Sequence, residues 1–125
     1  MGNVFDSSYA AGEDLTGYEK RAVMLTGKEI LKPVDGDSLP IGIVQNGPST
    51  GEAGKVDMMG RTTAICGGSV SQHDRLKPIT TADALPDDTG KLVVAASEDI
   101  VYFRALEAGE KDEVIEILAY GSGSV

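Results

Sequence analysis

The sequence predicts an all-β fold. Its apolar residues occur in short runs rich in Val, Ile and other strand-forming residues, and turn formers separate these runs, with 16 Gly and 5 Pro in 125 residues. The length corresponds to one domain. Because Trp is absent and there are only two Phe, we expect an aliphatic core. The predicted architecture is a small β-barrel, β-tulip-like or sandwich domain with short helical turns and an extended N-terminal arm.

Residues 1–17 predict the arm. They are mostly small and polar, and a segment that buries so little apolar surface does not fold by itself. Scattered apolar residues are present at Val4, Phe5 and Tyr9. Two interpretations stand side by side: a frayed tail, or an arm that orders on a partner, with Val4, Phe5 and Tyr9 as its anchors.

Residues 18–120 are expected to form the β domain. Residues 22–25 and 29–31 predict a hairpin with its turn at residues 26–27, and Pro33 ends it because proline cannot donate a ladder hydrogen bond. Residues 39–45 predict the next strand. Gly42, inside this strand, leaves room for the close approach of another backbone or a large side chain.

A loop of turn formers at residues 46–54 follows. It lacks both the Gly-Lys-Ser/Thr ending and the helix of a phosphate-binding loop. Further strands are predicted at residues 56–59, 61–66 and 75–78. Residues 82–85 could form one helical turn, and residues 92–96 a strand or a short helix.

The last two strands are predicted at residues 101–106 and 113–119, joined by a turn at Gly109, and residues 121–125 are expected to be a flexible tail. Alternation along the last strand puts Val114 and Ile115 on opposite faces, so one of them can lie in an interface. Cys66 is the single cysteine, which excludes an intrachain disulfide, and we expect it to be a buried small hydrophobe. The predicted core consists of Val23, Leu25, Ile30, Ile41, Ile43, Val56, Met58, Ile65, Leu76, Val93, Val101, Phe103, Leu106, Val114, Ile115 and Leu118.

The net charge of −9 argues against nucleic-acid binding, because phosphates require neutralisation by Lys and Arg. The acidity favours solubility and repulsion between free copies over docking onto a basic surface. No apolar run reaches the roughly 18 residues of a membrane-spanning helix, so no membrane association is expected. The N-terminus lacks the charged and apolar regions of a signal peptide, and we expect synthesis in a reducing cytoplasm.

No grouping of residues predicts catalysis. A hydrolytic triad needs a histidine beside a nucleophile, and the single candidate, His73, lies in a Ser-Gln-His-Asp turn typical of a solvated loop. The acidic pairs at residues 35–37 and 87–88 supply oxygens but not the remaining ligands of a calcium loop. We therefore expect no catalytic residue, no metal site, no cofactor and no enzymatic activity.

The order of elements resembles the small head-decoration, or capsid cement, proteins of tailed bacteriophages. The resemblance rests on the strand at residues 41–45 with its Gly/Glu loop, a strand ending near Gly67-Gly68, and the turn leading into residues 74–77. It continues with the turn and strand at residues 90–93, the strand and turn at residues 101–110, and the strand at residues 114–118.

This resemblance implies a structural protein of the virion that binds the exterior of a phage head and stabilises the shell. It implies the major capsid protein as partner, an N-terminal arm that orders against it, and a homotrimer, with a dimer possible. The alternative is a carbohydrate- or ligand-binding β module. That alternative would need exposed aromatic residues for stacking, and the chain has four Tyr, two Phe and no Trp.

Overall fold

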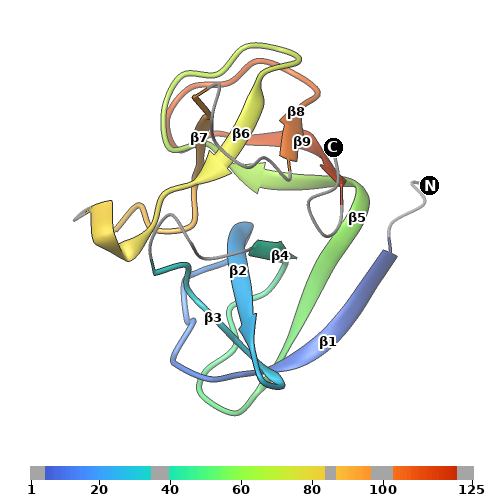
Figure 1. Ribbon diagram of the computed structural model, residues 1–125, viewed down its shortest axis with the longest axis vertical. Coiled ribbons are helices and arrows are strands. Elements are labelled where there is room, and N and C mark those ends of the chain that lie inside the picture. Colours follow the sequence, from blue (N-terminus) through green and yellow to red (C-terminus); the bar gives the residue numbers. More distant parts are fainter. Residues whose placement is uncertain (1–4, 35–39, 84–86, 97–102, 121–125) are drawn as a thin grey trace.

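The computed structural model describes residues 5–34, 40–83, 87–96 and 103–120 (Figure 1). It confirms the all-β prediction, since the elements in these ranges are strands apart from one short 3-10 helix. They are β1 (Phe5–Ala11), β2 (Arg21–Thr26), β3 (Glu29–Leu31), β4 (Pro40–Val44), β5 (Ala53–Ile65), β6 (Arg75–Pro78), η1 (Thr81–Asp83), β7 (Leu92–Val94), β8 (Phe103–Ala105) and β9 (Val114–Tyr120).

The first half of the chain forms a closed five-strand barrel. Its strands follow the order β1-β3-β2-β4-β5, and a pairing between β1 and β5 closes it. The predicted hairpin is present as β2 and β3, with Gly27 at φ 62° in its turn. The barrel interior is filled by one apolar cluster: Ala11, Leu15, Tyr18, Val23, Ile30, Val44 and Val56.

The expected close approach at Gly42 is confirmed. A Cβ at this position of β4 would collide with the backbone carbonyl oxygen of Asp57 on β5. Glycine therefore lets the two barrel strands approach closely.

The second half of the chain extends the barrel into an open sheet. β5 continues beyond the barrel to pair with β9, and β8, β6 and β7 follow in that order. The sequence predicts two strands here, at residues 56–59 and 61–66, whereas the structure has one strand that curves from one half of the molecule into the other (Figure 1). Gly60, at φ 102°, permits this bend, because glycine adopts positive φ without a Cβ penalty.

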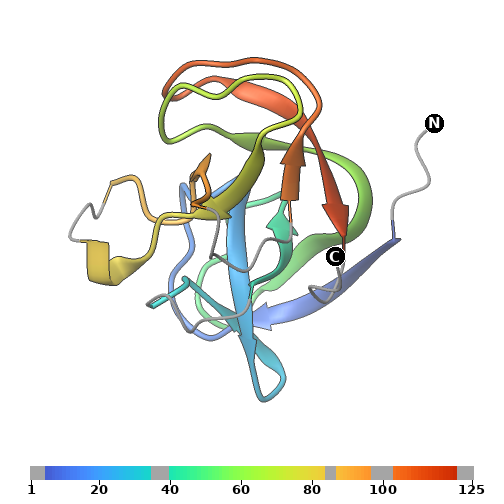
Figure 2. The ribbon, with the colours of Figure 1, turned by 45° about the horizontal axis from the view of Figure 1, so that its top comes forward.

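A second apolar cluster joins the open sheet, here called the distal sheet, to the barrel. Ala22 and Ile43 contribute to it from barrel strands. The remaining members come from the distal sheet and its loops: Ala64, Cys66, Val70, Leu76, Leu92, Phe103, Ala105, Ile115, Ile117 and Ala119. Figure 2 shows the distal sheet packed over the barrel. The second cluster contains residues of both, whereas the first fills the barrel interior.

The predicted core is confirmed where a residue faces one of these two clusters. Val23, Ile30, Ile43, Val56, Leu76, Phe103 and Ile115 are buried, as is Cys66, while Ile41, Met58, Ile65, Val93, Leu106 and Leu118 are half-buried. Val101 lies outside the described residues. Two assignments are wrong: Leu25 is 37% exposed on the β2–β3 hairpin, and Val114 is 52% exposed on the face of β9 opposite Ile115.

The prediction of a flexible arm over residues 1–17 is wrong for residues 5–17. β1 pairs with β5 from Phe5 opposite Met59 to Ala10 opposite Ala53, and it pairs with β3 as well. Ala11 and Leu15 are fully buried. A strand that closes a barrel gains backbone hydrogen bonds on both sides, so it can be ordered with few apolar side chains of its own. Val4 and the tail at residues 121–125 lie outside the described residues.

The smaller elements lie close to their predicted places. η1 covers Thr81–Asp83 and so overlaps the helical turn expected at residues 82–85, of which residues 84 and 85 are outside the described ranges. In the segment expected as a strand or short helix at residues 92–96, residues 92–94 form the strand β7.

Candidate functional site

The outer face of the distal sheet is a candidate contact surface. Strand alternation turns Ala64, Ile115, Ile117 and Phe103 toward the core, and their neighbours in sequence toward the outside. The pairing registers then place Ile65 beside Val114, Thr63 beside Glu116, and Arg61 beside Leu118. This outer face combines half-buried apolar side chains with exposed charged ones.

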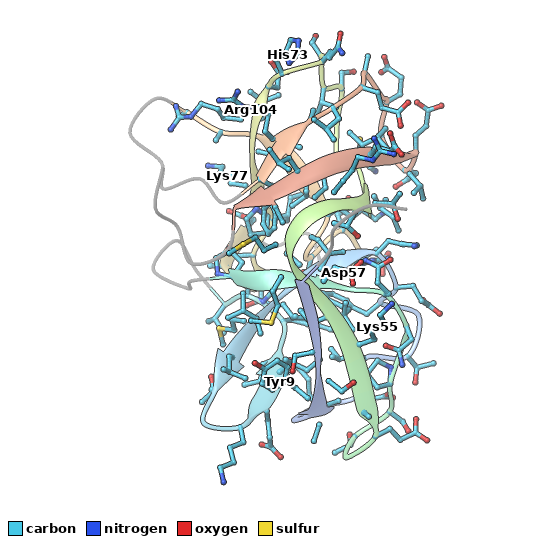
Figure 3. The ribbon with its side chains drawn as sticks, turned by 90° about the vertical axis from the view of Figure 1, so that its right-hand side faces the viewer. Tyr9, Lys55, Asp57, His73, Lys77 and Arg104 are labelled. Atoms are coloured by element: carbon cyan, nitrogen blue, oxygen red, sulfur yellow. The ribbon has the colours of Figure 1, made fainter. Side chains whose placement is uncertain are left out.

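Three arginines line this face at one level of the sheet, and a lysine lies two residues further along β6. Leu118 stands between Arg61 and Arg104, Arg104 stands opposite Arg75, and Lys77 follows Arg75 by two residues on the same face. We call Arg61, Arg75, Lys77 and Arg104 the basic row. Figure 3 shows Arg104 and Lys77 on the same side of the distal sheet, and His73 above them at the top of the molecule. The three arginines are exposed and Lys77 is half-buried.

Two arginines of the basic row face each other across adjacent strands. Like charges directly opposite one another on adjacent strands are destabilising, and Arg75 and Arg104 occupy such a pair of positions. At the other end of the row, Arg61 Nε lies 3.7 Å from Glu116 Oε2, and this ion pair contributes little because it is largely exposed.

A cluster of glutamates occupies the turn between β8 and β9. Glu107, Glu110 and Glu113, here called the acidic turn, are all exposed. Local hydrogen bonds shape the turn, since Glu110 Oε1 accepts from Ser69 Oγ at 2.5 Å and Glu113 Oε1 accepts from the Glu110 amide at 2.8 Å. Burial, together with these three carboxylates, raises the pKa of the Cys66 thiol.

Two partly buried polar clusters hold segments of the fold together. In the first, Lys20 Nζ donates to Gln45 Oε1 at 2.5 Å, Gln45 Nε2 donates to Thr62 Oγ1 at 3.1 Å, and Thr62 Oγ1 donates to Asp57 Oδ2 at 2.6 Å. This chain of bonds spans the point where β5 leaves the barrel. No local sequence pattern indicates this chain of bonds, because its members are adjacent only after the barrel closes.

The second cluster is centred on Lys91. Its Nζ atom lies 2.7 Å from Asp88 Oδ1 and 2.6 Å from Asp112 Oδ1. Burial alone would lower the pKa of Lys91, but the hydrogen bonds from its ammonium group to Asp112 and Asp88 outweigh burial and raise it. The cluster ties the turn at residues 87–91 to the acidic turn.

The anchor residues predicted in the N-terminal segment have different surroundings. Tyr9 is half-buried and packs against the barrel core, with its hydroxyl 4.0 Å from Met58 Sδ. Phe5 is the first residue of β1, opposite Met59, and Val4 lies outside the described residues. A role for these three residues in partner binding remains a prediction.

His73 occupies an exposed turn with φ 77°. Within residues 5–34, 40–83, 87–96 and 103–120, no group of His, Cys, Asp or Glu side chains is arranged to hold a metal ion. No helix in those same ranges is long and apolar enough to span a membrane.

Comparison with known proteins gives its result at the level of the fold. No family model matches the chain, and no curated protein sequence matches it. Among solved structures, the chain is similar to the N base of the head fibre gp8.5 of bacteriophage phi29, with a TM-score of 0.67 and 15% sequence identity over 98% of each chain. The two chains share one fold. The resemblance to a phage head protein, inferred from the order of the strands, is thus confirmed for the architecture.

Proposed function

We propose that this protein is a structural component of a bacteriophage head that binds the exterior of the shell and stabilises it. The observation that carries the proposal is the extent of the likeness to the phi29 head fibre base, which covers 98% of both chains. The likeness therefore includes both the barrel and the distal sheet, and is not limited to one motif shared by the two proteins. Since a fold by itself hosts many functions, attachment to a head requires a direct test.

We propose further that the protein is not an enzyme. Side chains that could carry chemistry have structural partners instead: Asp57 accepts from Thr62, and Lys91 bonds Asp88 and Asp112. His73 lies in an exposed turn. A shell-bound protein needs a stable frame and a contact surface, and the two packed clusters and the outer face of the distal sheet supply these.

The proposed partner is the major capsid protein, and the proposed assembly is a homotrimer. Attachment through the N-terminal segment is retained for Val4 and for Phe5, which is the first residue of the barrel-closing strand. Tyr9 has a second task, because it also packs against the barrel core.

The test is co-sedimentation of the purified protein with empty, expanded heads of the phage that encodes it. We expect saturable binding and a higher temperature of head disruption once the protein is bound. Unexpanded heads serve as a control for the mature lattice. A matched pair of variants, lacking residues 2–4 or 121–125, separates attachment by the N-terminal segment from a general effect of shortening the chain. Absence of saturable binding to expanded heads would refute the proposed function.

A further inference from the structure

Asn46 and Gly47 form the one Asn-Gly dipeptide of the sequence, at the start of the loop that joins β4 to β5. Asparagine is a thermolabile residue, because the backbone nitrogen of the next residue can attack its side-chain carboxamide. The attack is easiest before glycine, which has no side chain to shield that nitrogen and restricts the backbone least. The second asparagine of the chain, Asn3, precedes the β-branched Val4 and is therefore the less reactive of the two.

The side chain of Asn46 links the loop to β5 in the way that a strand's backbone would. Its Oδ1 accepts from the Lys55 amide at 2.9 Å, and its Nδ2 donates to the Ala53 carbonyl at 3.1 Å. Lys55 lies on the barrel part of β5 (Figure 3). A carboxamide supplies the donor and the acceptor from two separate atoms, whereas a carboxylate supplies acceptors alone. The fold therefore uses both ends of the group that is open to attack.

Gly47 is fixed by its packing against the segment that follows β1. A Cβ at this position would lie 3.0 Å from the Gly17 nitrogen and 3.1 Å from the Leu15 carbonyl oxygen. Both are backbone atoms, and the same segment is tied to the loop by the Leu15 amide, which donates to the Pro48 carbonyl at 2.9 Å. A larger residue at position 47 would push the loop away from this segment. Packing thus favours glycine directly after Asn46, although that order makes the asparagine reactive.

We propose that Asn46 is the residue at which this protein deamidates, and that the two hydrogen bonds from its side chain to β5 set the rate. The backbone nitrogen of Gly47 forms a bond to Cγ of Asn46, the bond from Cγ to Nδ2 breaks, and Nδ2 leaves as ammonia with the proton of the Gly47 amide. Water then opens the cyclic imide to aspartate or isoaspartate, so one water is consumed for each ammonia released. While Oδ1 and Nδ2 are bound to β5, Cγ is held away from the Gly47 nitrogen, and the attack must wait until the loop opens.

Deamidation would weaken the closure of the barrel. A carboxylate at residue 46 has no proton to donate to the Ala53 carbonyl, which is then left without this bond. The same loop holds the end of β1, since the Gly51 amide donates to the Ala11 carbonyl at 2.8 Å and the Ala11 amide donates to the Glu52 carbonyl at 2.9 Å. The modified protein should therefore be less stable than the original one.

The test incubates the full chain at mildly alkaline pH, in buffer and in guanidinium chloride, and locates the conversion of amide to acid by mass spectrometry of its peptides. We expect modification at Asn46 in both samples. It should be about thirtyfold slower in the native protein, which is the factor for two hydrogen bonds of ordinary strength. Asn3 should be modified much more slowly than Asn46 in guanidinium chloride.

A pair of variants tests the role of the loop without changing the dipeptide. Glu52→Ala removes the 3.0 Å hydrogen bond from the Ser49 amide to Glu52 Oε1, which braces the loop. The native rate should then rise about fivefold, as expected for one hydrogen bond. Glu29→Ala removes an exposed carboxylate from the β2–β3 hairpin and should leave the rate unchanged.

A second pair tests the effect on stability. Asn46→Asp should lower the melting temperature by roughly 3 °C, because the donor to the Ala53 carbonyl is lost. Gln72→Glu makes the same change from amide to acid in an exposed turn, and should leave the melting temperature unchanged.

Equal rates in the native and the unfolded protein would overturn the inference, because the two bonds would then not restrain Asn46. The same holds if the unfolded chain is modified at Asn3 first, or if Glu52→Ala does not raise the native rate. A melting temperature that is unchanged in Asn46→Asp would refute the structural role of the donor. None of these outcomes depends on attachment to a head.

Discussion

Leu15 tests whether the segment after β1 belongs to the folded domain. Its side chain is fully buried in the barrel cluster, beside Tyr18, Val23 and Ile30. Its backbone is also fixed, since its amide donates to the Pro48 carbonyl at 2.9 Å and its carbonyl accepts from the Tyr18 amide at 2.9 Å. Leu15→Ala therefore opens a cavity in a region that cannot easily collapse.

The expected loss is about 2–5 kcal/mol of unfolding free energy, the range for truncating a buried leucine. Domains of this kind have about 5–15 kcal/mol in total, so a large part of the stability would go. The melting temperature should fall by roughly 3 °C per kcal/mol. Urea unfolding followed by circular dichroism gives the free energy of unfolding. The slope of that free energy against urea concentration should be unchanged if only stability has changed.

Leu25→Ala is the matched control. It removes the same atoms from a side chain that is 37% exposed on the hairpin, and should cost less than about 1 kcal/mol. Deleting residues 2–16 should prevent folding, since it removes both Leu15 and the strand that closes the barrel. If Leu15→Ala costs no more than Leu25→Ala, or the deletion variant folds normally, the segment is an arm after all.

Three further outcomes are expected. Gly90→Ala should lower stability by more than about 2 kcal/mol, because Gly90 has φ 85° and a Cβ there would collide with the Tyr18 hydroxyl; a normal melting curve would contradict this. Cys66 is buried and its thiol has a raised pKa, so it should react with a disulfide reagent only when the protein unfolds. Rapid labelling of the native protein would contradict this. The hydrogen bond from Lys91 lowers the pKa of Asp88 in the folded protein. The stability that this bond contributes is therefore present above the unfolded pKa near 3.8 and is lost as the pH falls through the lower folded value. Lys91→Met should reduce the dependence of the unfolding free energy on pH in this acidic range.

Local sequence patterns were sufficient to predict the positions of most strands. The β2–β3 hairpin, β4, β6 and β9 follow from short apolar runs bounded by turn residues, and these signals act between neighbours in the chain. The alternation that separates Val114 from Ile115 is likewise a property of a single strand. The single buried cysteine was predictable for the same reason, from the strand-like residues around it.

The N-terminal segment shows where local patterns fail. β1 is ordered because β5 and β3 supply its hydrogen bonds, and neither strand is near it in sequence. A segment judged by its own apolar content was therefore predicted as an arm. The bend in β5 was interpreted as a strand break at Gly60 for a similar reason, since the pairing that continues through it involves β9, more than fifty residues later.

The candidate contact surface also depends on register. Arg61, Arg75, Lys77 and Arg104 are scattered along the sequence, and only the pairing of β5, β9, β8 and β6 aligns them. The sequence by itself determined the fold class, most strand positions, the acidity and the aliphatic core, because composition and alternation act over a few residues. Only the tertiary structure decided which strands pair, that the barrel closes through β1, and that cations gather on one face, because strand pairing joins residues that the sequence keeps far apart.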